Sequence, residues 1–307
     1  MGTRVKLTNI LVTGSSGFVG RHLVKKLSEI GVSFNSLDRA RFLATHEIPT
    51  EKCEIVIHLA GRAHVLREKS ADPYKEFYTA NCKFAIDVAK AASTKGLKRF
   101  VYVSSIGVFG KSCSINALTE ASGVEPKEHY STSKLEAEGE LTLLSRELGF
   151  ELVIVRPALV YGYDSPGNIN RLLALVEKLP VIPIAEKTNK RALVYVENLV
   201  DFLLLTTNHP RAAGKAFNIA DDSISTHEIL SGFAKGMKKK PILFAGPRII
   251  WKLIFFLTGK TKMYEQLFES LVIDMSYAQK ELGWQPKFET GIALENTGQM
   301  FIKGKYS

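Results

Sequence analysis

The fold of this chain is decided by one stretch near its start, Thr13-Gly14-Ser15-Ser16-Gly17-Phe18-Val19-Gly20. This stretch follows the apolar residues 10–12 and leads into an amphipathic segment, residues 18–30, so its glycines lie at a strand-to-helix turn. Glycines at G-x-x-G-x-x-G spacing let backbone N–H groups approach a diphosphate, and the helix presents its positive N-terminal end. We therefore predict a dinucleotide site here; the alternative is an ordinary turn between a strand and a helix.

An acidic residue follows the glycine turn. Asp38 stands 18 residues after Gly20, at the end of a second strand-like run, residues 32–37. A carboxylate there can accept hydrogen bonds from the adenosine ribose, which favours NAD. Arg39 could instead reach a 2′-phosphate, so NADP stays open. The predicted cofactor contacts of this part are Gly14, Ser16, Gly17, Phe18, Val19, Gly20, Asp38 and Arg39.

Composition and charge narrow the class of protein. The 307 residues are 45% hydrophobic and 23% charged, as in an ordinary globular protein of one large or two interlocked domains. Residues 1–9 contain no apolar segment of a secretory signal. The odd cysteine count, without metal-type spacing, suits free thiols in a reducing cytoplasm and predicts no metal site. The net charge of +10 favours acidic partners. No nucleic-acid-binding motif accompanies it, so a diphosphate-bearing substrate is the simpler partner.

Strands and helices alternate along the first half of the chain. Apolar runs predict strands at residues 5–12, 32–37, 55–61, 99–104 and 151–155, and helical periods predict helices at 18–30, 73–95 and 131–148. Residues 39–53 lack a clear strand and are predicted to be short or irregular. This alternation predicts an α/β fold, a doubly wound parallel sheet with its ligand site beyond the C-terminal ends of the strands. The glycine turn, Gly61, Ser105 and Arg156-Pro157 should meet there.

The alternation loosens after Pro157. We predict helices at residues 169–178, 196–207, 226–236, 247–257 and 276–282, and short strands near Leu193 and Phe217. The expected division is a cofactor-binding domain over residues 1–165 and a smaller mixed α/β substrate-binding region over 166–307. The two are interlocked, and parts of the second can return to the sheet.

The longest apolar stretch, residues 249–257, is too short to span a bilayer and is interrupted by Lys252. We predict that it is a helix packed on the core. Lysines stand at 238–240 before it and at 260 and 262 after it. These lysines keep weak peripheral contact with a membrane as the alternative.

Three residues form a candidate catalytic set. Ser105 ends a predicted strand, and Tyr130 and Lys134 follow four residues apart, which places them on one face of a helix. A phenol with an ordinary pKa near ~10 needs a neighbouring cation to act as a base at neutral pH. Lys134 and an oxidised nicotinamide would supply positive charge, and Ser105 could hold the same substrate oxygen. The alternative is a solvated Tyr-Lys pair and an ordinary turn serine.

Together these motifs resemble the extended short-chain dehydrogenases/reductases of the nucleotide-sugar epimerase/dehydratase family, from about Asn9 to Pro286. The resemblance implies a Rossmann-type fold with Ser105, Tyr130 and Lys134 as catalytic residues. His-Leu-Ala-Gly at 58–61 is similar to the family's H-L-A-A beside the nicotinamide. Further matches are an asparagine in the next helix and an Arg-Pro after the fifth strand. The cofactor contacts implied are Leu59, Ala60, Gly61, Asn81, Tyr130, Lys134 and Pro157.

The resemblance extends to the substrate side. Arg191, ahead of a V-x-D-like stretch, stands where relatives contact the substrate's diphosphate, and Asn168 and Ser105 are further predicted substrate contacts. The tail at 282–286 is similar to the family's L-G-W-x-P. Residues 62–65 and 270–274 resemble a bacterial branch that includes 4-epimerases and 4-keto reductases of UDP-N-acetylhexosamine-type sugars. Leu159 departs from the pattern, since many relatives have an asparagine there, and no adenine-side acid is identifiable in residues 39–53.

The implied activity is a 4-epimerase of UDP-hexose or UDP-N-acetylhexosamine, with NAD and transient oxidation at C4. A 4-keto reductase consuming NAD(P)H would use the same residues. Ile106 and Gly107 leave no acid–base pair beside Ser105 for a dehydratase. A non-catalytic NAD(P)-binding regulator is the alternative of another class, and relatives are commonly homodimers.

Overall fold

The computed structural model describes residues 9–63, 70–114 and 116–306. Six parallel strands form its central sheet, in the order β2-β1-β3-β4-β5-β9. The strands are β1 (Ile10–Thr13), β2 (Phe34–Leu37), β3 (Ile55–His58), β4 (Arg99–Val103), β5 (Glu151–Pro157) and β9 (Lys215–Ile219). From β1 the chain goes out to β2 and then returns to β3 on the other side. The switch point of this doubly wound sheet therefore lies between β1 and β3, where such folds bind ligands.

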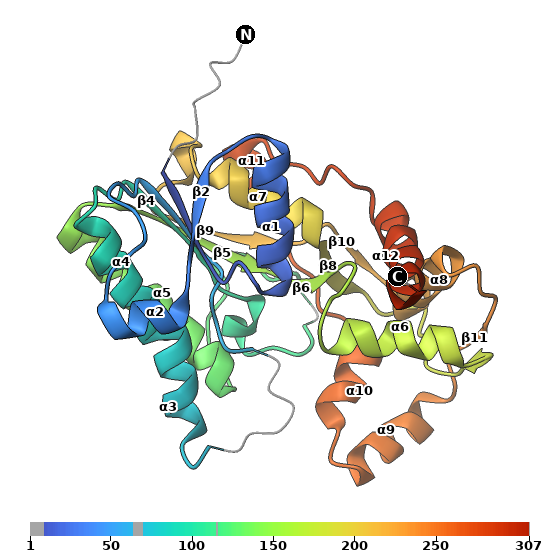
Figure 1. Cartoon of the computed structure of the whole chain (residues 1–307). Coiled ribbons are helices and arrows are strands. Elements are labelled where there is room, and N and C mark those ends of the chain that lie inside the picture. Colours follow the sequence, from blue (N-terminus) through green and yellow to red (C-terminus); the bar gives the residue numbers. More distant parts are fainter. Residues whose placement is uncertain (1–8, 64–69, 115, 307) are drawn as a thin grey trace.

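Helices cover both faces of this sheet (Figure 1). One face carries α1 (Phe18–Glu29), α7 (Val196–Thr206) and α11 (Ser276–Leu282). The other face carries α2 (Arg39–Thr45), α3 (Pro73–Tyr78), α4 (Phe84–Ser93) and α5 (His129–Leu148). Leu23 and Leu27 of α1 are fully buried with Val200 of α7 on the first face. Phe84 of α4 and Leu141 of α5 are buried on the second.

A π-helical turn, Thr79–Lys83, joins α3 to α4. The sequence predicts one continuous helix over 73–95, because the apolar period of Phe77, Ala80 and Phe84 continues through the turn. The turn is supported from the sheet, where the Tyr102 hydroxyl donates a hydrogen bond of 3.2 Å to the carbonyl of Asn81. Turns of this kind often mark functional positions in helices.

The C-terminal half builds a second region beside the sheet. Its strands form two small sheets, β10-β8-β6 and β11-β7. These strands are β6 (Leu159–Tyr161), β7 (Val181–Ile182), β8 (Arg191–Tyr195), β10 (Asp222–Ile224) and β11 (Ile242–Leu243). Their helices are α6 (Asn168–Lys178), α8 (Thr226–Gly236) and α12 (Thr290–Tyr306), which share one core. Helices α9 (Arg248–Leu257) and α10 (Thr261–Phe268) form a hairpin at the lower edge in Figure 1.

The predicted fold class is confirmed, with local corrections. Residues 39–53 contain helix α2, because the Asp38 side chain accepts a hydrogen bond from the Arg41 amide and caps it. The first strand was predicted over 5–12 and is observed at Ile10–Thr13, while residues 5–8 lie outside the described residues. The sequence analysis missed α10, α12 and the short strands β6, β7, β10 and β11. Helix α9 is not packed into the core as predicted, since only Phe255 among its side chains is buried.

Candidate active site

The glycine turn lies directly against the end of β3. A Cβ added to Gly14 would lie 2.7 Å from the Ala60 nitrogen, and one added to Gly20 would lie 2.0 Å from the Gly14 carbonyl oxygen. Gly14 also has a φ of +69°, a conformation that side chains disfavour. The turn is closed by a 3.0 Å hydrogen bond from the Gly17 amide to the Gly14 carbonyl. Only glycine fits at these positions, and the bare backbone before α1 is suited to a diphosphate.

A threonine couples the two strand ends at the switch point. The amide of Leu59 donates to the Thr13 carbonyl and the amide of Ala60 donates to the Thr13 hydroxyl, both at 3.2 Å. Thr13 is completely buried, and the sequence analysis did not assign it to the site. The available signal was a hydroxyl residue at the end of a strand, directly before the glycine turn.

Gly61 forms a shelf between the glycine turn and α5. A Cβ on Gly61 would lie 3.0 Å from Oδ1 of Asn81 and 3.3 Å from Nζ of Lys134. The Asn81 side chain is buried beneath this shelf, where its Oδ1 accepts from the Arg62 amide at 2.6 Å and its Nδ2 donates to the Ser133 hydroxyl at 2.9 Å. Asn81 thus positions the loop after β3 against α5. Ser133 was not singled out in the sequence, although it lies inside the Y-S-T-S-K stretch.

Ser105, Tyr130 and Lys134 come together at the C-terminal end of β4. The Ser105 hydroxyl lies close enough to that of Tyr130 to affect its pKa. Nζ of Lys134 donates to the Val103 carbonyl at 2.8 Å and lies 4.7 Å above the centre of the Tyr102 ring. These contacts bring the strand end and the first turns of α5 to the edge of the Gly61 shelf.

Burial dominates the electrostatics of these groups. It raises the pKa of Tyr130 above its ordinary value, and the nearby Ser105 hydroxyl partly opposes this rise. Burial lowers the pKa of Lys134 to about 8, with Glu138 acting in the opposite direction. We expected Lys134 to lower the phenol's pKa. In the protein without cofactor the desolvation of the phenol is the larger effect.

Gly107 packs beside Ser105. In the sequence this residue only indicated that no acidic side chain follows the serine. A Cβ on Gly107 would lie 2.6 Å from the Ser131 hydroxyl oxygen and 3.3 Å from that of Ser105. Its amide donates to the Ser105 hydroxyl at 3.0 Å. The glycine therefore lets the loop after β4 close onto α5 and orients Ser105. The only sequence signal was a glycine two residues after the serine.

On the adenosine side, Asp38 and Arg39 are exposed at the end of β2. One carboxylate oxygen of Asp38 accepts from the Arg41 amide at 2.7 Å, so this side chain has a structural role as well as its predicted cofactor role. The Arg39 guanidinium lies 5.2 Å from the centre of the Phe84 ring. This contact holds Arg39 over α4.

The other predicted cofactor residues lie at or just after the C-terminal ends of β1, β3 and β5. The Ser16 carbonyl accepts from Nη1 of Arg21 at 2.8 Å, and the Phe18 ring packs edge-on against His22. Val19 and Leu59 pack against the core on the α1 face. Pro157 ends β5 in the interior, after Arg156.

Arg156 is fixed by a buried ion pair. Its guanidinium donates to both carboxylate oxygens of Glu138 on α5, at 3.0 and 2.5 Å, and both side chains are buried. The guanidinium also lies 5.4 Å from the centre of the Phe109 ring. Arg156 thus ties β5 to the helix that carries Tyr130, a positioning role that its place in the sequence did not reveal.

The predicted substrate contacts lie in the C-terminal region. Arg191 begins β8, and its Nη1 donates to the carbonyls of Ser112 and Glu269 at 2.9 and 3.2 Å. Burial lowers the pKa of Arg191 to about 10. Asn168 begins α6 and donates to Gln266 of α10 at 3.0 Å. Both residues therefore contact the α10 segment, and in the described part of the chain neither side chain is hydrogen-bonded to Ser105 or Tyr130.

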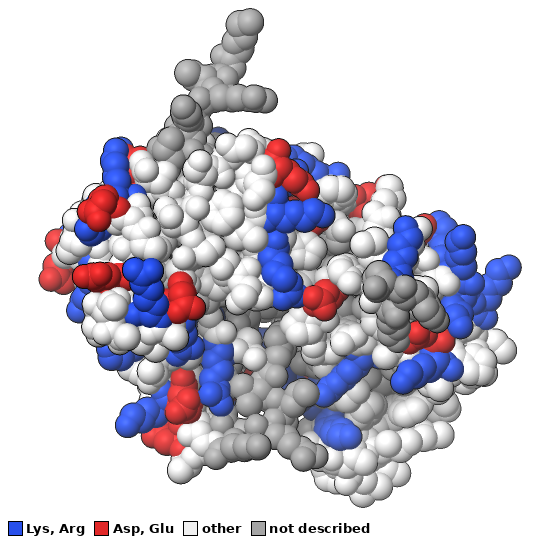
Figure 2. Space-filling view, viewed as in Figure 1, with Lys and Arg blue, Asp and Glu red and all other residues white. Residues whose placement is uncertain are grey.

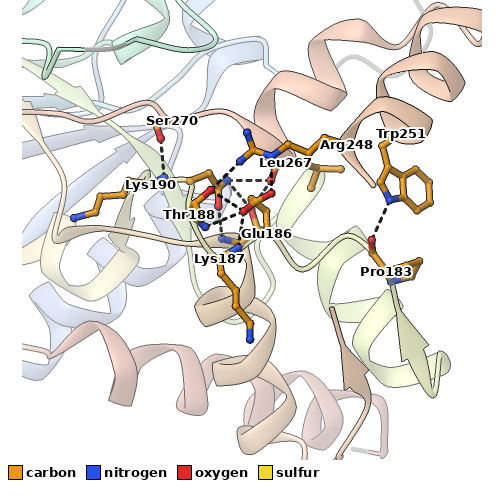
Figure 3. A network of polar contacts seen from close by, with 11 residues as sticks. Pro183, Glu186, Lys187, Thr188, Lys190, Arg248, Trp251, Leu267 and Ser270 are labelled. Atoms are coloured by element: carbon orange, nitrogen blue, oxygen red, sulfur yellow. Dashed lines mark hydrogen bonds and ion pairs between the residues drawn. The ribbon is translucent and has the colours of Figure 1, made fainter. Parts of the chain in front are cut away.

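A dense polar network holds the segment that leads to Arg191 (Figure 3). Glu186 accepts from Nε of Arg248 at 2.8 Å and from the Thr188 amide at 2.9 Å. Burial alone would raise the pKa of Glu186. These hydrogen bonds outweigh that effect and lower the pKa to about 2. The Lys190 amide donates to the Ser270 hydroxyl at 2.9 Å. The network joins α9, the segment after α10 and the start of β8.

The chain is similar in sequence to known proteins. The model of the NAD-dependent epimerase/dehydratase family matches residues 10–220. A UDP-glucose 4-epimerase from Vibrio cholerae is 33% identical over 98% of this chain and 98% of its own length. An N-acetyl-alpha-D-glucosaminyl-diphospho-ditrans,octacis-undecaprenol 4-epimerase from Escherichia coli O157:H7 is 24% identical over 76% of this chain and 73% of its own.

A solved structure has the same fold. A UDP-glucuronic acid 4-epimerase from Bacillus cereus, in complex with UDP-4-deoxy-4-fluoro-glucuronic acid and NAD, superposes with a TM-score of 0.75 at 20% identity. The match covers 97% of this chain and 99% of that one. At this identity the likeness establishes the fold of the whole chain and no more.

Proposed function

The chain belongs to the NAD-dependent epimerase/dehydratase family, and from this premise we propose that it is a nucleotide-sugar 4-epimerase that retains NAD. The substrate class is a UDP-hexose or UDP-N-acetylhexosamine. One observation carries the proposal. Ser105 at the end of β4 lies beside Tyr130 of α5, and Lys134, one helical turn after Tyr130, reaches the Gly61 shelf beside the glycine turn with its Nζ.

The tight glycine turn suits a dinucleotide, since Cβ atoms at Gly14 and Gly20 would clash with the backbone and prevent the turn from forming before α1. NAD, when bound, would supply the hydride acceptor and donor for C4 of the sugar. Tyr130, as the phenolate, accepts the proton of the 4-hydroxyl and gives it back after the sugar has turned. Ser105 holds the reacting oxygen through its hydroxyl, which the Gly107 amide orients.

Lys134 supplies the positive charge that this base requires. With a pKa of about 8 it is mostly protonated at pH 7, even though it is buried. The phenol's own raised pKa means that the charge of Lys134 and that of the oxidised nicotinamide must together favour the phenolate. Gly14, Gly17 and Gly20 would bind the diphosphate of NAD.

The finer assignments follow the same reasoning. Asp38 would bind the adenosine ribose, and Arg191 and Asn168 the substrate's diphosphate side. A one-way 4-keto reductase using NAD(P)H stays the alternative, and a sugar diphosphate linked to a lipid is a second substrate class, supported by the name of the Escherichia coli relative. A non-catalytic regulator is the alternative of another class. We also infer a homodimer and a cytoplasmic location.

The test is turnover without added cofactor. Purified protein is incubated with UDP-glucose, UDP-galactose, UDP-GlcNAc or UDP-GalNAc, and the products and the absorbance at 340 nm are measured. Interconversion of a pair of 4-epimers supports the proposal. Consumption of NAD(P)H only with a 4-keto sugar would favour the reductase, and bound NAD without turnover on any of these substrates would favour the regulator.

Tyr130→Phe tests the assignment of the base. The variant should retain bound NAD and lose roughly 10²- to 10⁴-fold in kcat, because it removes the group that accepts the proton. Near-normal turnover would reject Tyr130 as the base. Tyr74→Phe is the matched control, since Tyr74 is an exposed tyrosine that bonds Glu136.

A further inference from the structure

Helix α9 is held firmly on one side. The indole Nε1 of Trp251 donates to the Pro183 carbonyl at 3.0 Å (Figure 3). Phe255 is buried against α10. Nε of Arg248 bonds Glu186 at 2.8 Å, in the network described above. These three side chains fix the orientation of the helix. The opposite side of α9 therefore faces outward in a fixed orientation.

The outward side is entirely apolar. At about 100° per residue, six side chains cover an arc of roughly 160° around the helix. They are exposed by 78% at Ile249, 53% at Ile250, 57% at Leu253, 42% at Ile254, 67% at Phe256 and 73% at Leu257. We call these six residues the α9 outer face. A contiguous exposed apolar surface of this kind marks a binding surface, unlike isolated apolar side chains.

Basic residues predominate in the chain around this face. Residues 229–264 contain eight lysines and arginines and no aspartate or glutamate, and three of the eight, Lys235, Arg248 and Lys262, are paired with glutamates from other parts of the chain. Lys252 and Lys260 are exposed on α9 and just after it, and residues 238–240 add three more exposed lysines. In Figure 2 the lower right part of the molecule, which holds α9 and α10 in Figure 1, is mostly uncharged, and its upper margin carries several basic groups and an acidic one.

We propose that the α9 outer face docks on the surface of a membrane that contains anionic lipids. The six apolar side chains would enter the boundary between headgroups and acyl chains, while the surrounding lysines meet lipid phosphates. The contact is interfacial, because none of the helices in the part of the chain that the structure describes is both long and apolar enough to span a bilayer.

Charge favours this occupant over a second copy of the chain. In a symmetric dimer built on the α9 outer face, the lysines of one protomer would face those of its partner. Such like charges oppose association. An anionic bilayer offers the opposite charge together with an apolar layer, so it matches both properties of the surface.

Docking would place the substrate side of the protein near the bilayer. Helix α10 packs against α9, and its Gln266 bonds Asn168 while the carbonyl of Glu269, directly after it, accepts from Arg191. The docked helix thus contacts α10, and the α10 segment in turn contacts the residues assigned to the substrate. The proposal does not depend on the identity of the sugar.

The test is co-sedimentation with vesicles of neutral phosphatidylcholine, alone or mixed with phosphatidylglycerol. The wild-type protein should bind the mixed vesicles, and the triple variant Ile249→Ser/Leu253→Ser/Phe256→Ser should lose at least tenfold in partition coefficient. Lys252→Gln and Lys260→Gln should each lower binding to the mixed vesicles by about fivefold and leave neutral vesicles unaffected. High salt should weaken binding of the wild type.

Ile292→Ser is the matched control, because Ile292 on α12 is 54% exposed and lies outside the α9 outer face. It should bind as the wild type does, and circular dichroism should show that every variant is folded. Turnover of a soluble substrate should be the same in the triple variant, so binding and catalysis are read separately.

Three results would overturn the proposal. Wild-type protein that binds mixed vesicles no better than neutral ones has no anionic membrane site, and a protein partner would then be the occupant to seek. A triple variant that binds as the wild type does would exclude α9. An oligomer in light scattering that the triple variant dissociates and vesicles do not would assign the face to a second copy.

Discussion

Lys134→Met should change how the stability of the protein depends on pH. Lys134 is only 4% exposed, and burial lowers its pKa from 10.5 to about 8. Below pH 8 the lysine is charged in both the folded and the unfolded chain, so the folded state bears the full cost of the buried charge. Between pH 8 and 10.5 the folded protein releases this proton while the unfolded chain still holds it. Stability therefore rises with pH in this window.

The size of the effect follows from the two pKa values. Their difference corresponds to about 3 kcal/mol, of which about 2.5 kcal/mol should be gained between pH 7 and pH 10. Methionine fills a similar volume without a titrating group. The free energy of unfolding of the wild type, minus that of Lys134→Met, should therefore increase by about this amount over the same interval.

Urea unfolding of protein freed of bound nucleotide, at pH 7, 8, 9 and 10, measures this difference. Lys25→Met serves as the control, because the Lys25 side chain on α1 is 75% exposed, and its difference from the wild type should stay flat. A flat difference for Lys134→Met as well would refute the reasoning. It would show that the lysine keeps an ordinary pKa, so the site is more hydrated than its burial implies.

Three further substitutions test other parts of the site. Gly20→Ala should lower the free energy of unfolding by at least about 2 kcal/mol and abolish NAD binding, since its Cβ would lie 2.0 Å from a backbone oxygen. Gly291→Ala, at a helix position with open space around it, should raise the free energy of unfolding by about 0.5 kcal/mol. Equal urea midpoints for the two variants would contradict both expectations. Asp38→Ser keeps a capping oxygen and removes the charge, so titration calorimetry should show a reduced preference for NAD over NADP at nearly unchanged stability; an unchanged preference would exclude the carboxylate from the ribose site. Arg156→Met should lower the free energy of unfolding by about 3–5 kcal/mol in thermal unfolding, because it leaves the buried carboxylate of Glu138 without its partner. Adding Glu138→Leu should recover much of this loss. No recovery would mean that the loss comes from the packing of the Arg156 side chain and not from the unpaired charge.

The parts that could be predicted from the sequence are those with local causes. The glycine turn was predictable because an apolar run, three spaced glycines and an amphipathic segment all lie within twenty-odd residues. The approach of the glycine turn, Gly61 and Ser105 could be predicted because parallel strands bring their C-terminal ends to one edge of the sheet. The catalytic role of these residues stays a prediction.

The features that could not be predicted depend on contacts between residues far apart in the sequence, or on a residue that has two roles. Asp38 was interpreted only as a ribose ligand, so its role as the cap of α2 was missed. The partner of Arg156 on α5 cannot be identified from its own surroundings. The α9 outer face was predicted to be buried, because apolarity alone does not tell a core helix from an exposed one.

The π-helical turn at Thr79–Lys83 has a consequence for how this segment can change in length. A turn of this kind holds one residue more than the same stretch of a regular α-helix, while the flanking turns keep their register. Deleting one residue here should therefore restore a regular helix and leave Phe84 in the core, but it would remove the widened turn that presents Asn81 to Ser133. Such a deletion should change the loop after β3 more than it changes the fold.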